Sequence, residues 1–545
     1  MKIHPALIRI TAFLLSFALL MFPCVSNAQA SENKWWKESV FYEIYMPSYA
    51  DSNGDGYGDF KGMTSKLDYL QSLGIKALWL TPFLQSPKVD NGYDVTSYYD
   101  IDATYGSTED FKSFLAAAHK RNIKVIMDMV LNHTSTEAKW FRESRKSLDN
   151  SYRDYYIWKD KANNWESFFG GSAWEMDSVT NQYYYHKFDK RMADLNWANP
   201  KLVQDVQTML RYWLNLGVDG FRLDVINFLN TDGIIHDNPM RNGVQQHFYD
   251  INQKGVKDVM KKIKAVVGEY KDRFVVGEIG SDKIDVLTQY DLPELLDAVF
   301  NFNFGSMASF SGKRIYDELI SMGVNMRSFP TLFFGSHDMP RLMDRLANGD
   351  TSRARALAAL MLTAKGIPFI YYGDEIGMHN ITAQRVEEIV DIQGRTHYQI
   401  AVSNGKNAEA ALKEANENNR DKSRSPMQWN GNAFAGFSTT KSWIKIGQDY
   451  KEVNVQALTT KPNSILSFYK ELLALRNREK VLQYGSYDKL EYAQDQIFFT
   501  RYFGVDKISV IINFGSTKTA TLPAGAKILM GSTDLKPNSF LIYRN

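Results

Sequence analysis

The sequence predicts an α/β protein: a (β/α)8 TIM barrel with an inserted small domain after strand 3 and a C-terminal antiparallel β domain. Short β-branched or aromatic runs alternate with amphipathic helical stretches, and this alternation favours a barrel of parallel strands. Eight such runs can be counted, which is the number that a (β/α)8 barrel requires. They are VFYEIYM at Val40, ALWL at Ala77, VIMDMV at Val125, GFRL at Gly220, FVVG at Phe274, AVFNF at Ala298, TLFF at Thr331 and PFIYY at Pro368.

The domain boundaries follow from the spacing of these runs along the 545 residues. Residues 31–133 and 200–470 are expected to form the barrel. Residues 134–199 are rich in Trp, Tyr and Asn and too long for a strand-to-helix connection, so they are expected to form the inserted domain. A second insertion at 379–436 follows the eighth strand. Alternating runs such as QIFFTRYF and ISVIINF predict an antiparallel β domain at 482–545.

The first 30 residues have the pattern of a cleaved signal peptide. A short basic start precedes the apolar run ITAFLLSFALLMF, and Ala28-Gln29-Ala30 has the small-x-small form of a signal-peptidase site. The apolar run is shorter than the about twenty residues that a membrane-spanning helix needs. We therefore expect export to the periplasm or the medium without a stable membrane anchor, with an uncleaved anchor as the alternative. Cys24, the only cysteine, would leave with this segment.

Charge and composition exclude several kinds of partner. The formal charge is +2, and Lys2 and Arg9 account for it, because the first 30 residues contain no acid. The rest of the chain is neutral, which argues against a nucleic-acid partner or an anionic membrane. The hydrophobic content of 44% and the charged content of 23% are typical of a soluble globular protein.

Polar residues gather at the ends of four predicted strands. A (β/α)8 barrel brings the carboxyl ends of its strands to one rim, where active sites of this fold lie. A single Asp at a strand end is often a helix cap, but several carboxylates gathered with two histidines and arginine on one rim indicate catalysis. The residues at these ends are Asp128, Asn132, His133, Arg222, Asp224, Glu278, His337, Asp338 and Arg341.

Three acids on one rim could bind a metal ion or cleave a glycosidic bond. Arg222 and Arg341 would repel a cation, so glycoside cleavage without an organic cofactor fits better. A carboxylate nucleophile and a carboxylic acid about 5 Å apart cleave with retention of configuration. Arg222, two residues before Asp224 on the same strand face, would keep Asp224 ionised. Glu278, desolvated near other acids, would have a raised pKa and protonate the leaving oxygen, and Asp338 would stabilise the positive charge that develops on the sugar.

The segments DMVLNH, GFRLD, VGE and SHD occur in this order on the expected strands. In them the sequence resembles the four signature regions of the α-amylase superfamily, glycoside hydrolase family thirteen, and the resemblance covers nearly the whole mature chain. It implies Asp224 as nucleophile, Glu278 as acid/base and Asp338 as transition-state stabiliser. The residues implied around the same sugar are His133, Arg222 and His337.

Three more segments resemble the oligo-1,6-glucosidase group within this superfamily. They are DNGYD at 90–94, NNWESFFGGSAW at 163–174 and NRDKSRSPMQWN at 419–430. In that group the residues matching Asp90 and Arg424 hold the non-reducing end of the sugar, which closes the pocket and enforces exo action. The residue matching Tyr93 stacks on the same glucose. The residues matching Phe169 and Phe188 form an aromatic wall.

The segment DSNGDGYGD at 51–59 is typical of a calcium loop, with oxygen-bearing side chains at alternate positions and Gly at the sixth. A ninth-position Asp replaces the distant bidentate Glu of an EF-hand, and a metal-free surface turn is the alternative. In the group that the chain resembles, this loop binds a structural metal. The ligands implied for Ca²⁺ are Asp51, Asn53, Asp55, the carbonyl of Tyr57 and Asp59.

Val225 follows the expected nucleophile, and in the group that the chain resembles Val at this position accompanies α-1,6 preference, whereas Ala or Thr accompanies α-1,4 preference. The resemblance therefore implies a retaining, exo-acting α-glucosidase for small oligosaccharides or disaccharides such as isomaltose. One departure bears on the leaving-group side: the segment from Met192 to Asn196 reads MADLN where the group usually has QPDLN. This departure leaves the aglycone preference open.

Three alternatives to this function stand beside it. An α-1,4-glucosidase and a sucrose-active hydrolase, isomerase or transglucosidase belong to the same group. Isomerases usually carry an RLDRD segment near the seventh strand, and RLMDR at 341–345 does not match it. A catalytically silent, transporter-associated relative is the third alternative, but such relatives typically lose acids that this chain retains.

Overall fold

The computed structural model describes residues 34–233 and 236–545. The predicted signal peptide at residues 1–30 lies outside the described residues. Among the helices of the described part, none combines the length and the apolar character that crossing a membrane requires.

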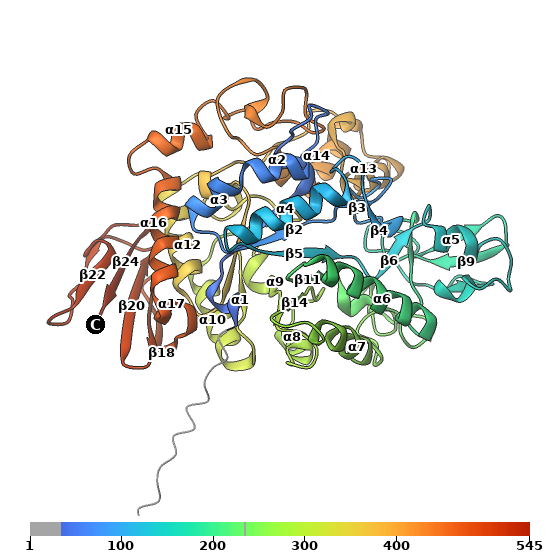
Figure 1. Cartoon of the computed structure of the whole chain (residues 1–545), viewed down its shortest axis with the longest axis horizontal. Coiled ribbons are helices and arrows are strands. Elements are labelled where there is room, and N and C mark those ends of the chain that lie inside the picture. Colours follow the sequence, from blue (N-terminus) through green and yellow to red (C-terminus); the bar gives the residue numbers. More distant parts are fainter. Residues whose placement is uncertain (1–33, 234–235) are drawn as a thin grey trace, which may run out of the picture. The chain divides into compact units, whose positions relative to one another are not determined.

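Eight parallel strands form the predicted barrel, and Figure 1 shows them surrounded by helices. The strands are β1 (Phe41–Ile44), β2 (Ala77–Leu80), β5 (Lys124–Met129), β11 (Gly220–Leu223), β14 (Phe274–Gly277), β15 (Ala298–Val299), β16 (Thr331–Leu332) and β17 (Ile367–Tyr371). Their hydrogen-bonded order is β15-β14-β11-β5-β2-β1-β17-β16. Each strand begins within one residue of the run that predicted it and ends at most three residues from the end of that run, so the barrel is confirmed.

The end strands β15 and β16 are joined through one side chain instead of a backbone ladder. Thr331 Oγ1 donates to the carbonyl of Val299 at 3.1 Å and accepts from the amide of Asn301 at 3.2 Å. A hydroxyl can donate and accept at once, so it takes the place of a ladder pair between strands that are only two residues long.

Helices cover the outside of the barrel, and their ends follow ordinary capping chemistry. Helix α6 (Pro200–Leu216) begins after Asn199, whose side chain accepts from the amide of Lys201, and ends at Gly217 in a left-handed conformation. Other helices of this layer are α4 (Thr108–Lys120), α7 (Val256–Gly268), α10 (Gly312–Asn325), α12 (Thr351–Thr363) and α16 (Ile465–Arg478). Helix α12 packs against α16 and the C-terminal sheet, so it is buried on nearly every side.

The inserted domain lies between β5 and α6. Strand β6 (His133–Ser135) pairs with β10 (Met192–Asp194), which ties the two ends of the insertion together. Between them lie α5 (Lys139–Ser144) and a small sheet of β7 (Trp158–Lys159), β8 (Trp174–Asp177) and β9 (Gln182–Tyr185). Trp and Tyr side chains fill its core, which is why this stretch of the sequence is rich in aromatic residues.

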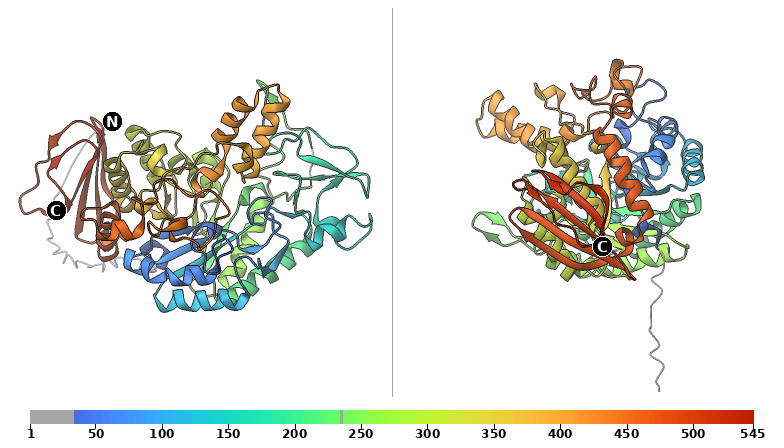
Figure 2. Two further views of the ribbon diagram at one scale, coloured as in Figure 1. Left: turned by 90° about the horizontal axis from the view of Figure 1, so that it is seen from above. Right: turned by 90° about the vertical axis from the view of Figure 1, so that its left-hand side faces the viewer.

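The second insertion contains a helical hairpin of α13 (Ile392–Ser403) and α14 (Ala408–Asn418), followed by the 3-10 helix η6 (Arg420–Ser423). In Figure 2 the hairpin, in orange, stands beside the inserted domain, in cyan. Ile400 reaches Gly170 of the inserted domain so closely that a Cβ on Gly170 would lie 3.0 Å from Ile400 Cδ1. The two insertions therefore meet over the carboxyl ends of the strands.

The C-terminal part is the predicted antiparallel β domain. After α17 (Lys480–Tyr484) it forms one sheet in the order β18-β19-β20-β24-β22. These strands are β18 (Ser486–Ala493), β19 (Gln496–Phe503), β20 (Asp506–Asn513), β24 (Ser539–Arg544) and β22 (Lys527–Gly531). Arg501 is fully buried and donates to the carbonyls of Gly485 and Thr363, which fastens the sheet to α12.

Candidate active site

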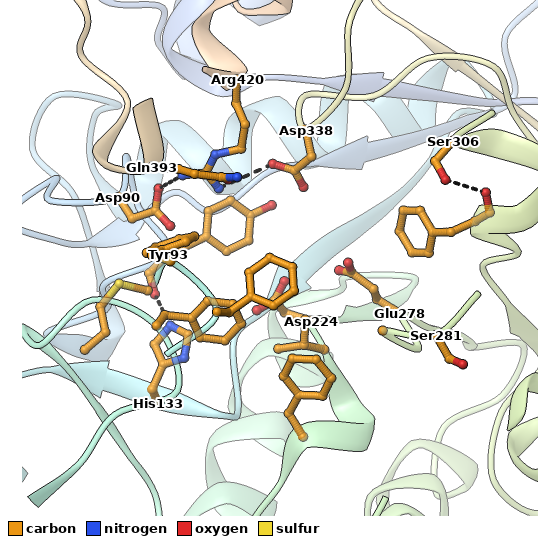
Figure 3. Close-up of a pocket in the computed structure, with 18 of the residues that line it drawn as sticks. Asp90, Tyr93, His133, Asp224, Glu278, Ser281, Ser306, Asp338, Gln393 and Arg420 are labelled. Carbon is orange, nitrogen blue, oxygen red and sulfur yellow. Dashed lines mark hydrogen bonds and ion pairs between the residues drawn. The ribbon is translucent and has the colours of Figure 1, made fainter. Parts of the chain in front are cut away.

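A pocket of about 540 Å³ opens at the carboxyl ends of the strands, and Figure 3 shows the acids and aromatic rings that converge on it. It brings together eight of the eleven residues predicted to act on the sugar. Its lining consists of Asp90, Tyr93, His133, Phe168, Phe169, Phe188, Met192, Asp224, Val225, Phe228, Glu278, Gly280, Ser281, Asp282, Phe302, Ser306, Asp338, Gln393 and Arg420. The three predicted residues outside this lining are Arg222, His337 and Arg424, which are buried behind it.

Strand β11 carries the centre of the site. A Cβ at Gly220 would lie 1.9 Å from the carbonyl oxygen of Phe274, so only glycine allows β11 to approach β14 in this way. Arg222 and Asp224, which directly follows the strand, are two residues apart. Their side chains therefore lie on the same face of β11. Arg222 Nη1 donates to Asp224 Oδ1 at 2.7 Å.

The Arg222 guanidinium binds three carboxylates at once. Besides Asp224, its Nη1 donates to Asp128 Oδ1 at 2.7 Å, and its Nη2 donates to Glu278. Parallel pairing of β11 with β5 places Arg222 opposite Asp128. One positive charge therefore meets three acids in a place that is largely closed to water.

The pKa values of the two central acids reflect this crowding. Burial raises the pKa of Asp224 to about 7 and that of Glu278 to about 8, and Arg222 opposes both shifts. The raised pKa predicted for Glu278 is found. Arg222 pairs with Asp224 and lowers its pKa, as predicted, but the single guanidinium is shared by three carboxylates and burial outweighs it.

Asp224 and Glu278 lie close to one another. Their carboxyl groups are within hydrogen-bonding reach, and the amide of Ile226 donates to the carbonyl of Glu278 at 3.0 Å. Neighbouring carboxyls of this kind fit a retaining mechanism better than an inverting one, which needs a wider gap for a water molecule. The separation therefore suits direct attack by one carboxylate and proton donation by the other.

Asp338 lies on the other side of the pocket, among cations (Figure 3). Its Oδ1 accepts from Arg424 Nη2 at 3.0 Å and lies 3.5 Å from Arg420 Nη1. Its Oδ2 lies 3.1 Å from His337 Nε2. Burial alone would raise the pKa of Asp338, but His337, Arg420 and Arg424 hold it well below its ordinary value. Asp338 is therefore the most firmly ionised acid of the pocket.

Asp90 pairs with Arg420, and the predicted pair of Asp90 with Arg424 is wrong. Arg420 donates to Asp90 inside the pocket (Figure 3). Arg424 is buried behind the lining, where its Nε donates to the carbonyl of His337 at 2.8 Å. Both arginines belong to the NRDKSR segment, and η6 separates them by slightly more than one turn. This turn directs Arg420 toward the cavity and Arg424 behind it.

The aromatic wall predicted from Phe169 and Phe188 is present. Their ring centroids are 5.5 Å apart at an angle of 64°, and the guanidinium carbon of Arg420 lies 5.4 Å from the Phe169 ring. His133 lies beside Phe188, with centroids 5.3 Å apart. Burial lowers the pKa of His133 to about 4, so this histidine is neutral at physiological pH.

Comparison with known proteins identifies the family. Residues 43–485 match the family model of the alpha-amylase catalytic domain. The chain belongs to the α-amylase family. It is therefore a glycoside hydrolase, and the fold and the pocket described above are those of a family member.

Several α-amylase family relatives are similar along nearly their whole length. The oligo-1,6-glucosidase of Bacillus cereus is 39% identical over 511 residues, which cover 89% of this chain and 91% of the relative. The solved structure of Bacillus licheniformis trehalose-6-phosphate hydrolase has a TM-score of 0.84 at 36% identity and covers 94% of this chain and 100% of its own. That of the trehalulose synthase of Pseudomonas mesoacidophila has a TM-score of 0.84 at 34% identity, with coverage of 94% and 99%.

In this α-amylase family member, Val225 has an unusual backbone. It lines the pocket directly after Asp224, with φ 33° and ψ 44°. A β-branched residue in the left-handed region is strained by about 1–3 kcal/mol, and such strain is found at functional sites. The hydrogen bond of the next amide, that of Ile226, to the carbonyl of Glu278 helps to maintain this conformation.

The predicted calcium loop lies apart from the pocket, packed against residues 437–443. The carboxylate of Asp51 accepts from the amides of Asn53, Gly54 and Gly56, and from the hydroxyl of Ser438 at 2.6 Å. Asp59 accepts from Ser52 and caps α2 (Phe60–Ser65). The oxygen donors suit calcium by type. Within residues 34–233 and 236–545, however, no group of three acidic, His or Cys side chains is arranged to hold a metal ion.

Sequence reasoning missed several residues in and around the site, among them Arg420, Gln393 and Glu43. Arg420 stands four positions before Arg424 in the same motif. The motif therefore identified the segment that contacts the pocket, but not which of its two arginines binds Asp90. Gln393 in α13 reaches the pocket from the second insertion. Glu43 lies in β1 and is 1% exposed. Glu43 could have been found because it is an acid inside a predicted buried strand. Burying an unpaired carboxylate is costly, so such an acid is expected to have a partner.

Proposed function

We propose that this glycoside hydrolase is a retaining, exo-acting α-glucosidase that cleaves short α-glucosides and prefers α-1,6 linkages such as that of isomaltose. The observation that carries the proposal is the pair of Asp224 and Glu278 on the guanidinium of Arg222, with their carboxyl groups in hydrogen-bonding reach. The names of the relatives, above all the oligo-1,6-glucosidase, support the choice of substrate.

The reaction proceeds in two steps with Asp224 as nucleophile. In the first, an Asp224 carboxylate oxygen forms a bond to the anomeric carbon while the glycosidic bond breaks and Glu278 gives its proton to the leaving oxygen. In the second, Glu278 takes a proton from a water molecule, whose oxygen replaces Asp224 at the anomeric carbon. The higher pKa of Glu278 fits its start as the acid, because the least acidic carboxyl of a crowded cluster retains the proton.

Asp338 stabilises the transition state. Its firmly ionised carboxylate faces the pocket and is fixed by Arg424 and His337 from behind. A negative charge that is already in place needs no reorganisation when positive charge develops on the sugar ring. His133 and Tyr93 complete the surroundings of the same glucosyl unit.

Exo action follows from the closed end of the pocket. The ion pair between Asp90 and Arg420 spans the side opposite Ser281 and Ser306 in Figure 3. A sugar chain cannot continue through this pair, so only one glucosyl unit fits beyond the cleaved bond. The remainder of the substrate leaves on the side of Ser281 and Ser306, next to Glu278.

The experiment is product analysis with four substrates. We expect isomaltose and the α-1,6 bond of panose to be cleaved fastest, maltose and sucrose more slowly, with α-glucose as the first product by proton NMR. Accumulation of β-glucose would overturn retention. Conversion of sucrose into an isomer without release of glucose would favour the isomerase alternative, and absence of hydrolysis of all four sugars would overturn the proposal.

Two further assignments are proposed from the sequence pattern. We propose that residues 1–30 direct export and are removed, so that the mature chain begins at Ser31; mass spectrometry of the native protein tests this. We also propose that the loop at 51–59 binds a structural calcium ion, since its donor atoms are all oxygens. Asp51, Asn53, Asp55, Asp59 and the carbonyl of Tyr57 would hold the ion, away from the reacting sugar.

A further inference from the structure

Glu43 lies directly beneath the pocket, in contact with His337. Its Oε1 is 2.6 Å from His337 Nδ1 and accepts from the backbone amide of His337 at 3.1 Å. Both side chains are almost fully buried. Glu43 lines a small void together with Asp338 and Arg222, but it does not reach the pocket in which we place the sugar.

The other ring nitrogen of His337 faces two oxygens. Nε2 lies 2.6 Å from Tyr93 Oη and 3.1 Å from Asp338 Oδ2. Tyr93 donates its hydroxyl proton to Asp128, whose two oxygens also accept from Arg222. A nitrogen lone pair facing both Tyr93 Oη and an ionised Asp338 would be repelled by each. Nε2 must therefore carry a hydrogen, which it donates to these oxygens.

A proton on Nε2 leaves two possibilities at Nδ1. Either Nδ1 has a lone pair and accepts a proton from a neutral Glu43 carboxyl, or Nδ1 also carries a hydrogen and donates it to a Glu43 carboxylate. In both cases the Glu43–His337 pair holds one proton between Oε1 and Nδ1. We propose that Glu43 is a positioning residue that shares this proton with His337 and thereby fixes His337 as an Nε2–H donor toward Asp338.

A carboxyl group is suited to this position in a way that an amide is not. Oε1 accepts from the His337 amide and can at the same time carry the proton that it gives to Nδ1. An amide oxygen could accept from the backbone but could not donate to Nδ1, and an amide nitrogen could donate but not accept. Burial raises the pKa of Glu43 and lowers the pKa of His337 to about 3, so the shared proton resides on the glutamate.

The inference rests on the proposed function, because its effect on the reaction passes through Asp338, the assigned transition-state stabiliser. The inference can also be tested by a measurement that does not depend on activity. Nitrogen NMR of the wild-type protein with labelled histidine distinguishes a protonated ring nitrogen from an unprotonated one. We expect Nε2 of His337, assigned by comparison with His337→Asn, to be protonated at pH 7. An unprotonated Nε2 would overturn the proposal.

The second test is Glu43→Gln. The amide oxygen introduced by this substitution would accept from the backbone amide, so a neutral His337 would have to place its hydrogen on Nδ1 and turn a lone pair toward Asp338. We expect Nε2 to appear unprotonated in the nitrogen NMR spectrum of this variant, and kcat to fall by about tenfold or more at pH 7.5. The charged and titratable groups around the pair stay unchanged in this variant: Tyr45, Tyr93, Asp128, Arg222, Asp338, Tyr371, Arg420 and Arg424.

Glu375→Gln is the matched control. Glu375 is also a fully buried glutamate of the barrel, but it accepts from the hydroxyls of Tyr42 and Tyr69 and from the amide of Gly373. It should leave the protonation of His337 Nε2 unchanged. A Glu43→Gln protein that keeps Nε2 protonated, with kcat within twofold of wild type, would overturn the proposal. If Glu43→Gln does not fold, the NMR reading of the wild-type protein decides, and lack of wild-type activity on any α-glucoside would count against the proposed function instead.

Discussion

Arg420 and Asp90 meet across 330 residues of sequence, and their ion pair joins the second insertion to the loop that follows β2. Asp391, which is fully buried, binds the same guanidinium from behind and holds it in place. Arg420 is thus fixed by the protein before any sugar arrives. This preorganisation is what an end wall of a one-glucose pocket requires.

Replacement of Arg420 by Ala should open this end of the pocket. We expect KM for isomaltose to rise by about ten- to a hundredfold, because the lost contacts hold the glucosyl unit in both ground and transition states. The variant should also release fragments longer than glucose from maltoheptaose. Arg385→Ala is the control, since Arg385 lies in the same insertion but on the surface. A KM within twofold of wild type for Arg420→Ala would contradict the role of the pair.

Asp224→Asn should lower turnover by several orders of magnitude without loss of the fold. An amide is too weak a nucleophile to form the glycosyl-enzyme bond, whereas removal of one of three crowded carboxylates relieves repulsion around Arg222. The melting temperature should therefore stay level or rise. Asp285→Asn, on the exposed start of α8 (Ile284–Tyr290), serves as control. The assignment fails if Asp224→Asn keeps more than a tenth of wild-type activity.

The pH dependence of kcat/KM should be bell-shaped, with its maximum between about 7 and 8. Asp224 must be ionised to attack, so activity is lost as pH falls below its raised pKa. Glu278 must be protonated to donate, so activity is lost as pH rises above its higher pKa. Because the two carboxyls interact, the two limbs of the profile report apparent pKa values of the pair and not of either residue alone. An aryl glucoside has a leaving group that departs without protonation, so it can be used to assay Glu278→Gln. With this substrate the variant should no longer lose activity at high pH. If activity still falls at high pH, Glu278 is not the group that titrates there.

Val225→Ala should narrow the preference for isomaltose over maltose. The branched side chain lines the pocket directly after the proposed nucleophile, where it would restrict how the second sugar approaches. An α-1,6 bond has one more rotatable carbon with which to avoid it. Steric discrimination of this size is worth about 1–3 kcal/mol, so the wild-type preference should be tens to about a hundredfold. The measurement is the ratio of kcat/KM for isomaltose to kcat/KM for maltose. A change in the fraction of folded protein affects both values equally and cancels in this ratio. A wild-type preference for maltose, or an unchanged ratio in the variant, would refute the linkage assignment.

Removal of the proposed calcium ion should lower stability without a direct effect on catalysis. A metal that binds only the folded state raises the free energy of unfolding by about 2.7 kcal/mol at a hundredfold excess over its dissociation constant. Chelator should therefore lower the melting temperature of the wild-type protein, and Asp51→Asn should reduce that response. The loop contacts residues 437–443, so its loosening should reach the segment that directly follows the second insertion. An unchanged melting temperature together with no metal by elemental analysis would refute the proposal.

Much of the fold and the centre of the site were determined by the sequence itself. Strand periodicity and the eight runs identified the barrel, because local alternation of apolar and polar residues follows directly from strand and helix geometry. Once the strands were placed, Asp224, Glu278 and Asp338 had to meet, since the carboxyl ends of parallel strands share one rim. The long Trp- and Tyr-rich interval likewise indicated an inserted domain before any contact was known.

Only the tertiary structure decided which charges act together. Arg420 and Arg424 lie in one motif, and a single turn of η6 determines which of them reaches Asp90. The pKa of Asp224 depends on burial and on a guanidinium shared by three strands, neither of which is a property of its neighbours in the sequence. The contact of Glu43 with His337 joins β1 to the loop that follows β16, across 294 residues. Electrostatic energies depend on distance and on exclusion of water, and both are determined only when the barrel closes.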